Sequence, residues 1–268
     1  MQVVTLGPEG TYSHRAARAV DEDVVFRESV SGIVDAVDSG AYERGVVPIE
    51  NSIEGSVTET LDAIANADIA VIQEIVTPIR HALLAQSANF DTVASHSQAL
   101  AQCRSFLERE YPDAELEPVT STARGVEYAR EDPTVAGIGH PDNAGDDLTV
   151  IAEDIQDRSS NATRFLVIAP VEERAEGGGK STIVVYPNAN YPGLLLELLE
   201  AFAERDINLS RIESRPSGNR LGDYLFHIDF DAGLYEDRAK EALEDIEEIA
   251  ENGWVKRLGS YDKRHVLY

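Results

Sequence analysis

Short apolar segments alternate with amphipathic segments over residues 1–170. The apolar segments predict β-strands at residues 3–6, 45–49, 69–76, 81–85, 92–95, 135–138 and 165–168. Apolar positions at helical spacing predict one helix that begins near Ser13 and three more over residues 57–65, 97–109 and 122–130. This alternation predicts an α/β fold with largely parallel sheets, in which ligands bind beyond the carboxyl ends of the strands and near helix N-termini.

The C-terminal part has a different order of elements. Strands are predicted at residues 182–186, 208–213, 223–230 and 254–258, and helices at residues 192–204 and 237–250. The first of these helices carries one apolar stripe, formed by Leu194, Leu195, Leu198, Leu199 and Phe202. The order βαββαβ is typical of a ferredoxin-like domain. The charged, glycine-rich segment 171–180 is expected to be a linker between residues 1–170 and 181–268.

Acidic residues outnumber basic residues by 49 to 23, which gives a formal net charge of −26. A field this negative argues against nucleic acids and anionic membranes as partners. The acids are spread along the chain, and only four of the basic residues are lysines. Such a surface suits a cytoplasm of molar salt, where the Debye length is about 3 Å. We therefore favour a halophilic protein over an acidic protein of a low-salt cell.

The single cysteine, Cys103, excludes an intramolecular disulfide bond and a cysteine-rich zinc site. The first residues lack the basic and apolar regions of a signal peptide, and no apolar run is long enough to span a membrane. The expectation is a cytoplasmic protein. The sequence contains no HExxH, CxxC or GxSxG motif, so it gives no support for a metal site or a serine hydrolase.

Two polar segments follow predicted strands in the first part of the chain. GPEGTYS at residues 7–13 could hold an anion through Thr11, Ser13 and the amides of the next helix. Alone, it favours an ordinary turn in which Ser13 caps that helix. VPIENSIEGS at residues 47–56 places an acid, an amide and a hydroxyl where α/β sheets present ligands, but a polar loop that ends in a capping Ser56 is equally plausible.

Two further segments place polar groups near strand ends. SHSQ at residues 95–98 is followed one helical turn later by Gln102; on its own, His96 is interpreted as a structural histidine and Ser97 as a helix cap. NATRF at residues 161–165 sets Arg164 beside a hydroxyl. That arginine pairs either with a substrate carboxylate or with a surface acid, and surface pairs are commoner.

The fifth segment, LSRIESRP at residues 209–216, is predicted to be a strand that runs into a turn closed by Pro216. Strand alternation places Leu209, Arg211 and Glu213 on one face. By itself the segment predicts no more than the edge of a hairpin.

Together and in this order, the five segments resemble the prephenate dehydratase family. GPEGTYS, VVPIENSIEGSV, SHSQALAQC and NATRF resemble its catalytic part, and NYPGLLLELLEAFAERDINLSRIESRP resembles the regulatory ACT domain that follows it. The resemblance implies a lyase that converts prephenate to phenylpyruvate, water and CO₂ in phenylalanine biosynthesis, without a metal or organic cofactor. It also implies a two-lobed catalytic domain like a periplasmic binding protein over residues 1–170, and an ACT domain over residues 181–268.

The resemblance assigns roles in the catalytic part. It implies that Thr163 is essential and donates a hydrogen bond, or relays a proton, to the leaving hydroxyl. The other residues at catalytic positions are Glu50, Asn51, Ser52, Ser95 and Gln102. The residues implied in substrate binding, chiefly of the two carboxylates, are Thr11, Ser13, Thr122, Asn161, Arg164 and Phe165.

For the ACT domain, the resemblance implies feedback inhibition by phenylalanine, bound at an interface of a homodimer or homotetramer. The implied binding residues are Asn190, Pro192, Gly193, Leu194, Leu195, Glu213, Ser214, Arg215 and Pro216. We expect bound phenylalanine to shift a population between open and closed clefts.

Two alternatives stay open at this point. An arogenate dehydratase would perform the same elimination on a substrate with an amine in place of the keto group. A sensor would bind an amino acid without catalysis, although it has no evident need for both Glu50-Asn51-Ser52 and Thr163-Arg164-Phe165. Since no chorismate mutase segment precedes Met1, a monofunctional dehydratase is the leading expectation.

Overall fold

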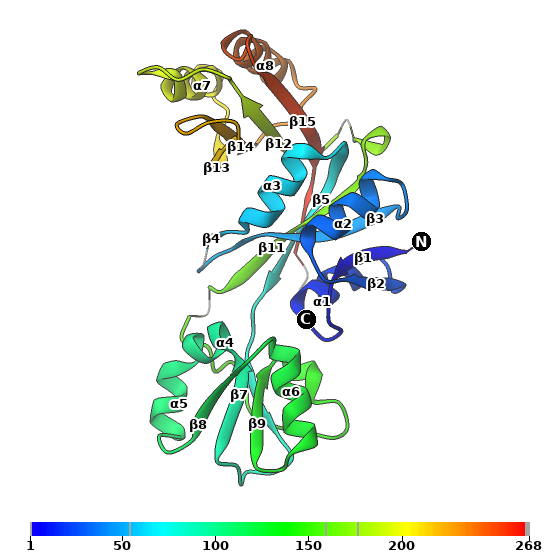
Figure 1. Ribbon diagram of the computed structural model, residues 1–268, viewed down its shortest axis with the longest axis vertical. Helices are drawn as coiled ribbons and strands as arrows, with labels where there is room; N and C mark the ends of the chain where they lie inside the picture. The colour runs from blue at the N-terminus through cyan, green and yellow to red at the C-terminus, as the bar shows by residue number, and fades with distance from the viewer. Residues whose placement is uncertain (1, 54, 159, 176, 266–268) are drawn as a thin grey trace.

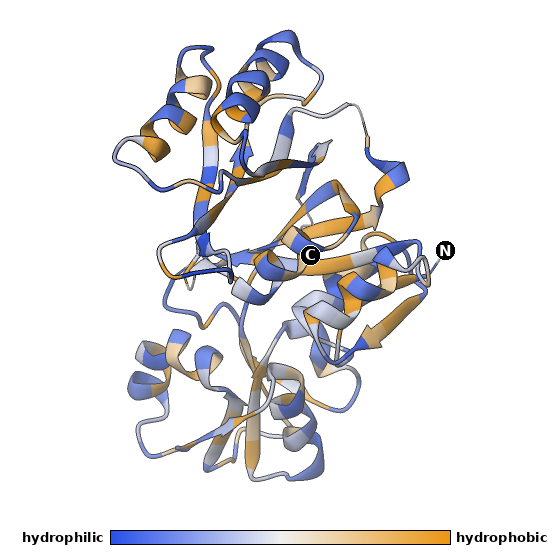
Figure 2. Ribbon diagram, turned by 45° about the horizontal axis from the view of Figure 1, so that its top comes forward, coloured by the Kyte–Doolittle hydropathy of each residue, from blue (hydrophilic) through white to orange (hydrophobic). Residues whose placement is uncertain are grey.

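Figure 1 shows the computed structural model, which describes residues 2–53, 55–158, 160–175 and 177–265. The molecule is elongated and has three parts, with the first lobe in the middle, the second lobe at one end and the C-terminal domain at the other. Each part is built on its own sheet. Figure 2 shows hydrophobic residues concentrated in the strands, whereas the helices alternate between hydrophobic and hydrophilic faces. None of the helices in the described part of the chain has the length and apolar character needed to cross a bilayer.

The first lobe contains a seven-stranded sheet. Six of its strands lie in the order β16 (Lys263–His265), β5 (Ile69–Pro78), β11 (Ala162–Pro170), β3 (Arg44–Asn51), β1 (Val3–Leu6) and β2 (Val24–Arg27). The two-residue strand β4 (Gly55–Ser56) pairs with β3. The helices of this lobe are α1 (Tyr12–Arg18), α2 (Val30–Asp38) and α3 (Thr58–Asn66). Helix α3 buries Leu61 and Ile64, which the helical spacing placed on one face.

The second lobe contains a five-stranded sheet in the order β10 (Thr149–Ala152), β6 (Ala82–Ala85), β9 (Val135–Gly139), β7 (Thr92–His96) and β8 (Glu115–Val119). Its helical elements are α4 (Ser97–Gln102), α5 (Arg104–Glu110), α6 (Thr122–Glu131) and the 3₁₀ turn η1 (Pro141–Ala144). The single helix predicted over residues 97–109 is therefore wrong. The helix breaks at Cys103, whose φ of −107° and ψ of 11° interrupt the helical ladder.

The α/β class and the two-lobed architecture are confirmed, but the prediction of largely parallel sheets is wrong. Strands β1, β3 and β5 run toward the second lobe, and after β5 the chain enters that lobe as β6. Strand β11 brings the chain back and lies antiparallel to both β3 and β5. The lobes are thus joined by two crossings, and the strands that end or begin there face the gap between the lobes.

The C-terminal domain has an antiparallel sheet in the order β13 (Leu209–Pro216), β14 (Tyr224–Phe230), β12 (Lys180–Tyr186) and β15 (Trp254–Tyr261). Helices α7 (Leu194–Ala203) and α8 (Asp237–Ile249) complete the predicted βαββαβ order, which is confirmed. Between this domain and β11 lies the turn η2 (Val171–Glu173). One face of this sheet packs on the first lobe. From that face, Leu225, Leu258 and Tyr261 join one hydrophobic cluster with Ile64 and Val71 of the first lobe.

The last described strand departs from the sequence-based division of the chain. Strand β16 pairs in parallel with β5, through Lys263 opposite Glu74 and Arg264 opposite Ile75. Residues 263–265 therefore belong to the sheet of the first lobe, although the sequence assigned them to the C-terminal domain. The hydrophobic pattern gave no signal for this strand, because two of its three residues are basic.

Candidate active site

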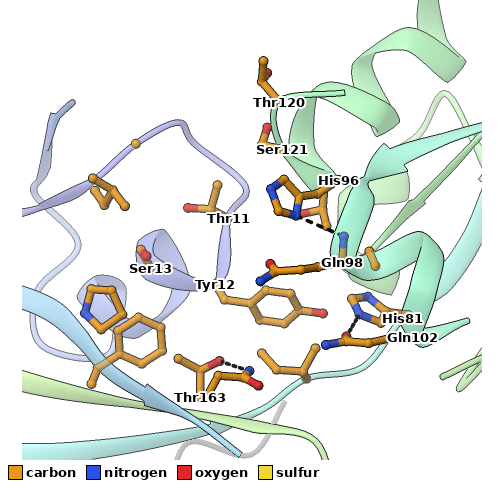
Figure 3. Close-up of a pocket in the computed structure, with 18 residues that line it drawn as sticks. Thr11, Tyr12, Ser13, His81, His96, Gln98, Gln102, Thr120, Ser121 and Thr163 are labelled. Atoms are coloured by element: carbon orange, nitrogen blue, oxygen red, sulfur yellow. Dashed lines mark hydrogen bonds between the residues drawn. The ribbon is translucent and has the colours of Figure 1, made fainter. Parts of the chain in front are cut away.

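A pocket of about 320 Å³ lies between the two lobes (Figure 3). Its volume is at the lower end of the range of about 300–1,000 Å³ for small-molecule sites. The first lobe contributes Leu6, Gly7, Thr11, Tyr12, Ser13, Pro48, Asn51, Thr163 and Phe165. The second lobe and the crossing contribute Ile79, His81, His96, Gln98, Ala99, Gln102, Thr120, Ser121 and Thr122. A ligand in this pocket would touch both lobes.

The side chains of Thr163 and Asn51 form the floor of the pocket. They are directly opposite each other on the antiparallel strands β11 and β3. Asn51 Nδ2 donates to Thr163 Oγ1 at 3.0 Å, and Asn51 Oδ1 accepts from the backbone amide of Ile53 at 2.9 Å, which fixes the orientation of the amide. Thr163 is therefore an acceptor in this bond, and its own proton remains available for a hydrogen bond into the pocket.

A chain of side-chain hydrogen bonds extends from this pair to the second lobe. Asn51 Nδ2 also lies 3.3 Å from Asn161 Oδ1, and Asn161 Nδ2 donates to Gln102 Oε1 at 2.9 Å. His81 Nε2 lies 3.0 Å from the same Gln102 oxygen and is its donor, since the oxygen can only accept. Burial lowers the pKa of His81, despite the opposing hydrogen bond to Gln102, so the imidazole is neutral near pH 7.

Tyr12 adds an aromatic wall that also connects the lobes. Its hydroxyl donates to the backbone carbonyl of Arg80 at 2.5 Å. Its ring makes edge contacts with His81 and His140, at centroid distances of 6.2 and 6.1 Å. Burial and the charge of Arg15 lower the pKa of His140 to about 4, so this imidazole is also neutral near pH 7.

Helices α1, α4 and α6 begin at the pocket. Their caps are Thr11, which accepts from His14 N, His96, which accepts from Gln98 N, and Ser121, which accepts from Arg124 N. The predicted caps at Ser13 and Ser97 are therefore wrong; Ser56 also caps no helix, since α3 begins after Val57 without a side-chain cap. Among the residues that the structure describes, none of those lining the pocket is Lys, Arg, Asp or Glu. An anion here would rely on hydroxyl, amide and backbone N–H donors.

The structure brings part of the predicted set together and leaves the rest outside. The predicted residues that line the pocket are Thr11, Ser13, Asn51, Gln102, Thr122, Thr163 and Phe165. Asn161 is buried behind them and reaches the pocket through its bonds to Asn51 and Gln102. Ser52 does not line the pocket; its side chain joins the end of β3 to the start of β11. Its hydroxyl donates to Ser160 O at 3.1 Å and accepts from Ala162 N at 3.0 Å.

Besides Ser52, three more predicted residues do not reach the pocket. Ser95 is fully buried and donates to Ile138 O at 2.8 Å within the second-lobe sheet. Glu50 and Arg164 are opposite each other on β3 and β11, one residue away from the Asn51–Thr163 pair. Because side chains alternate along a strand, this places them on the opposite face, toward the C-terminal domain. The predicted partner of Arg164, a substrate carboxylate, is replaced there by Glu74 and Asp229.

Sequence reasoning missed several lining residues. Tyr12, Thr120 and Ser121 stand beside predicted residues, and His96 and Gln98 belong to a segment that the sequence singled out, although His96 was interpreted as structural. His81 lies in no motif. Its signal is its place between strands that cross from one lobe to the other, and this becomes visible only once β5 and β6 are assigned to different sheets.

Comparison with known proteins decides the family. Residues 3–173, which hold every residue of the pocket, match the family model described as prephenate dehydratase.

The chain belongs to the prephenate dehydratase family.

Relatives with this name cover almost the whole chain. The prephenate dehydratase of Methanocaldococcus jannaschii is 39% identical over 269 residues, which cover 95% of each protein. The bifunctional chorismate mutase/prephenate dehydratase of Aquifex aeolicus is 38% identical and covers 98% of this chain, which spans 74% of that protein. A crystal structure of prephenate dehydratase from Arthrobacter aurescens in complex with L-Phe has a TM-score of 0.89 and 36% identity, with 98% of this chain and 90% of that chain covered.

The C-terminal domain of the chain matches the ACT domain model over residues 188–249. A hollow of about 140 Å³ lies at the start of α7 and contains three of the predicted phenylalanine-binding residues, Asn190, Leu194 and Leu195. Its other lining residues are Ala189, Tyr191, Gly222, Tyr224 and Phe226. Pro192 and Gly193 form the turn that precedes α7, and the φ of 103° at Gly193 favours glycine there.

The other predicted segment of the ACT domain, Glu213 to Pro216, does not line this hollow. Glu213 accepts from Ser56 Oγ at 2.9 Å, and Arg215 makes two hydrogen bonds to Asp62 at 2.9 and 2.7 Å. Both contacts join β13 to the first lobe. Ser214 and Pro216 alternate with them on the exposed face of the strand.

Proposed function

We propose that this chain is a carbon–oxygen lyase that converts prephenate to phenylpyruvate, water and CO₂, and that phenylalanine inhibits it through the ACT domain. The observation that carries the proposal is the orientation of Asn51, which makes Thr163 an acceptor and leaves its hydroxyl proton for the substrate. In the reaction, the bond from the ring to its carboxylate breaks, CO₂ leaves, and the electron pair of that bond moves into the ring as the C4–oxygen bond breaks. The ring becomes aromatic only when the oxygen departs with its bonding pair, and with one added proton that oxygen leaves as water.

Thr163 acts on the leaving oxygen. A threonine hydroxyl is a weak acid, so its contribution is a hydrogen bond that strengthens as negative charge develops on that oxygen. His81 is neutral near pH 7 because its pKa is lowered, and through Gln102 and Asn161 it holds the amide that orients Thr163. The two carboxylates of the substrate would be held by hydroxyl groups and by backbone amides at the helix starts, with Ser13 and Thr122 as hydroxyl donors, since the Thr11 hydroxyl already donates to Pro8 O at 2.9 Å.

The pocket favours prephenate over arogenate. An ammonium group would need an anionic partner, and the described lining residues include no carboxylate. The test is phenylpyruvate formation from prephenate by the full chain in molar KCl, with and without phenylalanine, beside arogenate as the competing substrate. Turnover of prephenate that phenylalanine suppresses is the expected result. A folded protein inert with both substrates would favour the amino-acid sensor.

We propose further that the chain forms a homodimer or homotetramer through its ACT domains. Eight large hydrophobic side chains of this domain are exposed among the described residues: Tyr191, Leu195, Leu196, Ile212, Leu221, Tyr224, Tyr235 and Trp254. Three of them, Tyr191, Leu195 and Tyr224, gather around the hollow at the start of α7, and exposed apolar side chains that gather at one place are typical of an interface. A second subunit would therefore close a phenylalanine site there.

We propose that the protein functions in a salt-rich cytoplasm. Reducing conditions suit Cys103, which is buried in the second lobe, where burial raises the pKa of its thiol. The net charge of −26 predicts that melting temperature and activity both rise between 0.1 M and 2 M KCl, because the Debye length falls from about 10 Å to under about 3 Å and self-repulsion is screened. Thermal melts and initial rates across this range measure the effect. A flat response in both would contradict the halophilic hypothesis and leave the dehydratase proposal untouched.

A further inference from the structure

Six charged side chains meet where the C-terminal sheet packs on the first lobe: Glu50, Glu74, Arg164, Lys180, Arg211 and Asp229. We call them the buried ion cluster. Glu74 and Asp229 are each 1% exposed. The cluster contains three cations and three anions, although the whole chain carries −26. Burying Glu74 and Asp229 requires a close cationic partner for each, so the geometry around these two carboxylates is tightly constrained.

Arg164 is at the centre of this cluster. Its Nε donates to Glu74 Oε2 at 2.6 Å, its Nη1 to Asp229 Oδ2 at 2.5 Å and its Nη2 to the Tyr261 hydroxyl at 3.1 Å. Glu74 is in the same sheet as Arg164, on β5, whereas Asp229 and Tyr261 are in the ACT sheet, on β14 and β15. The planar guanidinium is therefore held from two domains at once.

The neighbours of Arg164 in the chain face the other way. Thr163 and Phe165 line the pocket, while the guanidinium between them lies in the buried ion cluster. Any shift of Arg164 along or across β11 also moves the backbone of Thr163, because the two residues share a peptide bond. The hydroxyl of Thr163 must meet the leaving oxygen within hydrogen-bond distance, and a misplacement of about 1 Å can lower a rate by about 100-fold.

We propose that Arg164 is a positioning residue through which the ACT sheet holds Thr163 in the active site. The proposal rests on the proposed dehydratase function for its kinetic consequence. It differs from a role in binding the substrate carboxylates, since each of the three nitrogens of the guanidinium donates to a partner outside the pocket, Glu74, Asp229 or Tyr261. It also gives the ACT domain a direct structural part in the catalytic step, through a carboxylate on β14.

The test compares steady-state kinetics of the full chain in molar KCl for Arg164→Lys, Asp229→Asn and the control Asp62→Asn. Lysine at position 164 keeps the positive charge but cannot bond to all three partners of the guanidinium. Asparagine at position 229 removes the negative charge through which the ACT sheet binds Arg164. For both we expect kcat to fall about tenfold with KM within about twofold, the signature of a lost interaction specific to the transition state. Asp62→Asn breaks the exposed pair with Arg215 in the same interface and should leave kcat and KM unchanged.

Tyr261→Phe is the mild variant if a charged substitution prevents folding. It removes one hydroxyl partner of Arg164 and keeps the packing of the ring, so kcat should fall by about threefold. A rise in KM at unchanged kcat in Arg164→Lys would show contact with substrate and overturn the proposal. So would folded variants with the kcat of the wild type.

Amide hydrogen exchange separates this proposal from the proposed function. Exchange in the segment 162–166 should accelerate in Arg164→Lys and Asp229→Asn and stay unchanged in Asp62→Asn. If the wild type does not turn over prephenate, the dehydratase proposal fails, and the exchange rates still decide whether the buried ion cluster holds β11. Unaltered exchange in all variants would overturn the proposal that Arg164 and the buried ion cluster hold β11 in place.

Discussion

Replacing Thr163 with alanine is expected to lower kcat for prephenate by about 10³-fold, the contribution typical of a positioned proton or hydrogen-bond donor at a reacting atom. The substitution removes the hydroxyl that Asn51 orients and leaves the rest of the pocket lining in place. KM should stay within about threefold, because the hydrogen bond to the leaving oxygen gains its strength in the transition state. Initial rates of phenylpyruvate formation, together with binding of a substrate analogue, measure both parts of this expectation.

Thr163→Ser is the matched control. Serine keeps the hydroxyl at the same position and loses only the methyl group, so kcat should remain within about tenfold of the wild type. If alanine and serine lowered kcat equally, the hydroxyl would have no special role. An alanine variant with full activity would remove Thr163 from the mechanism.

His227 predicts an acid-sensitive fold. The imidazole is fully buried on β14, and neither of its nitrogens has a hydrogen-bond partner in the described structure. Burial, with the charge of Arg211 second, lowers its pKa to about 4. The other charged groups that act on it are Asp229 on its own strand, Arg215 on β13 and Asp62 on α3. The folded protein therefore holds His227 neutral well below the ordinary pKa of histidine.

The direction of the pH effect follows from the two states. As pH falls below about 6.5, the unfolded chain binds a proton at His227 and the folded protein does not, so stability is complete above that pH and is lost toward pH 4. For this one residue the loss at pH 5 is about 2 kcal/mol. His227→Leu, which is close in volume and cannot ionise, should abolish this loss and change the stability at pH 7.5 by less than about 1 kcal/mol.

Urea unfolding of both proteins at pH 7.5 and pH 5.0, in the same KCl concentration, isolates the effect of His227. The carboxylates titrate in both proteins, so their contributions cancel in the difference between wild type and variant. An equal loss of stability in the two proteins between these pH values would show that His227 does not titrate as the structure indicates.

Hydrophobic periodicity predicted the helices and strands that bury one clear face, but it did not predict the other elements. The strands β5 and β11 follow directly from the sequence. The stripe predicted for α7 is confirmed at Leu194, Leu198 and Phe202 and is wrong at Leu195, which is exposed. Helix α2 was missed, although Ser29 caps it by accepting from Gly32 N and its Ile33, Val34 and Val37 are buried. Strands β8 and β10 were missed because they are edge strands, with few fully buried residues to produce a pattern.

For the site, contiguous motifs were a poorer guide than strand geometry. Applied to residues 50–51 and 163–164, the alternation of side chains would have kept Asn51 and Thr163 in the pocket and sent Glu50 and Arg164 to the opposite face. Pairing between strands could not be read from the sequence, since the antiparallel register of β3 and β11 depends on a return crossing from another lobe. His81 was unpredictable for the same reason.

The return of the chain to the first lobe through β16 determines how the ACT domain can move. The linker reaches β12 beside the point where β15 leaves for β16, and Gly179 N donates to Asp262 Oδ1 at 3.1 Å, so both chain passages form one narrow connection. Rotation about this connection displaces each strand in proportion to its distance from it. Strand β13 is at the far edge of the sheet and has the longest lever arm. A small rotation of the ACT domain would therefore first break the contacts of Glu213 with Ser56 and of Arg215 with Asp62. Lys180 and Tyr261 lie close to the connection and would keep their contacts with Glu74 and Arg164.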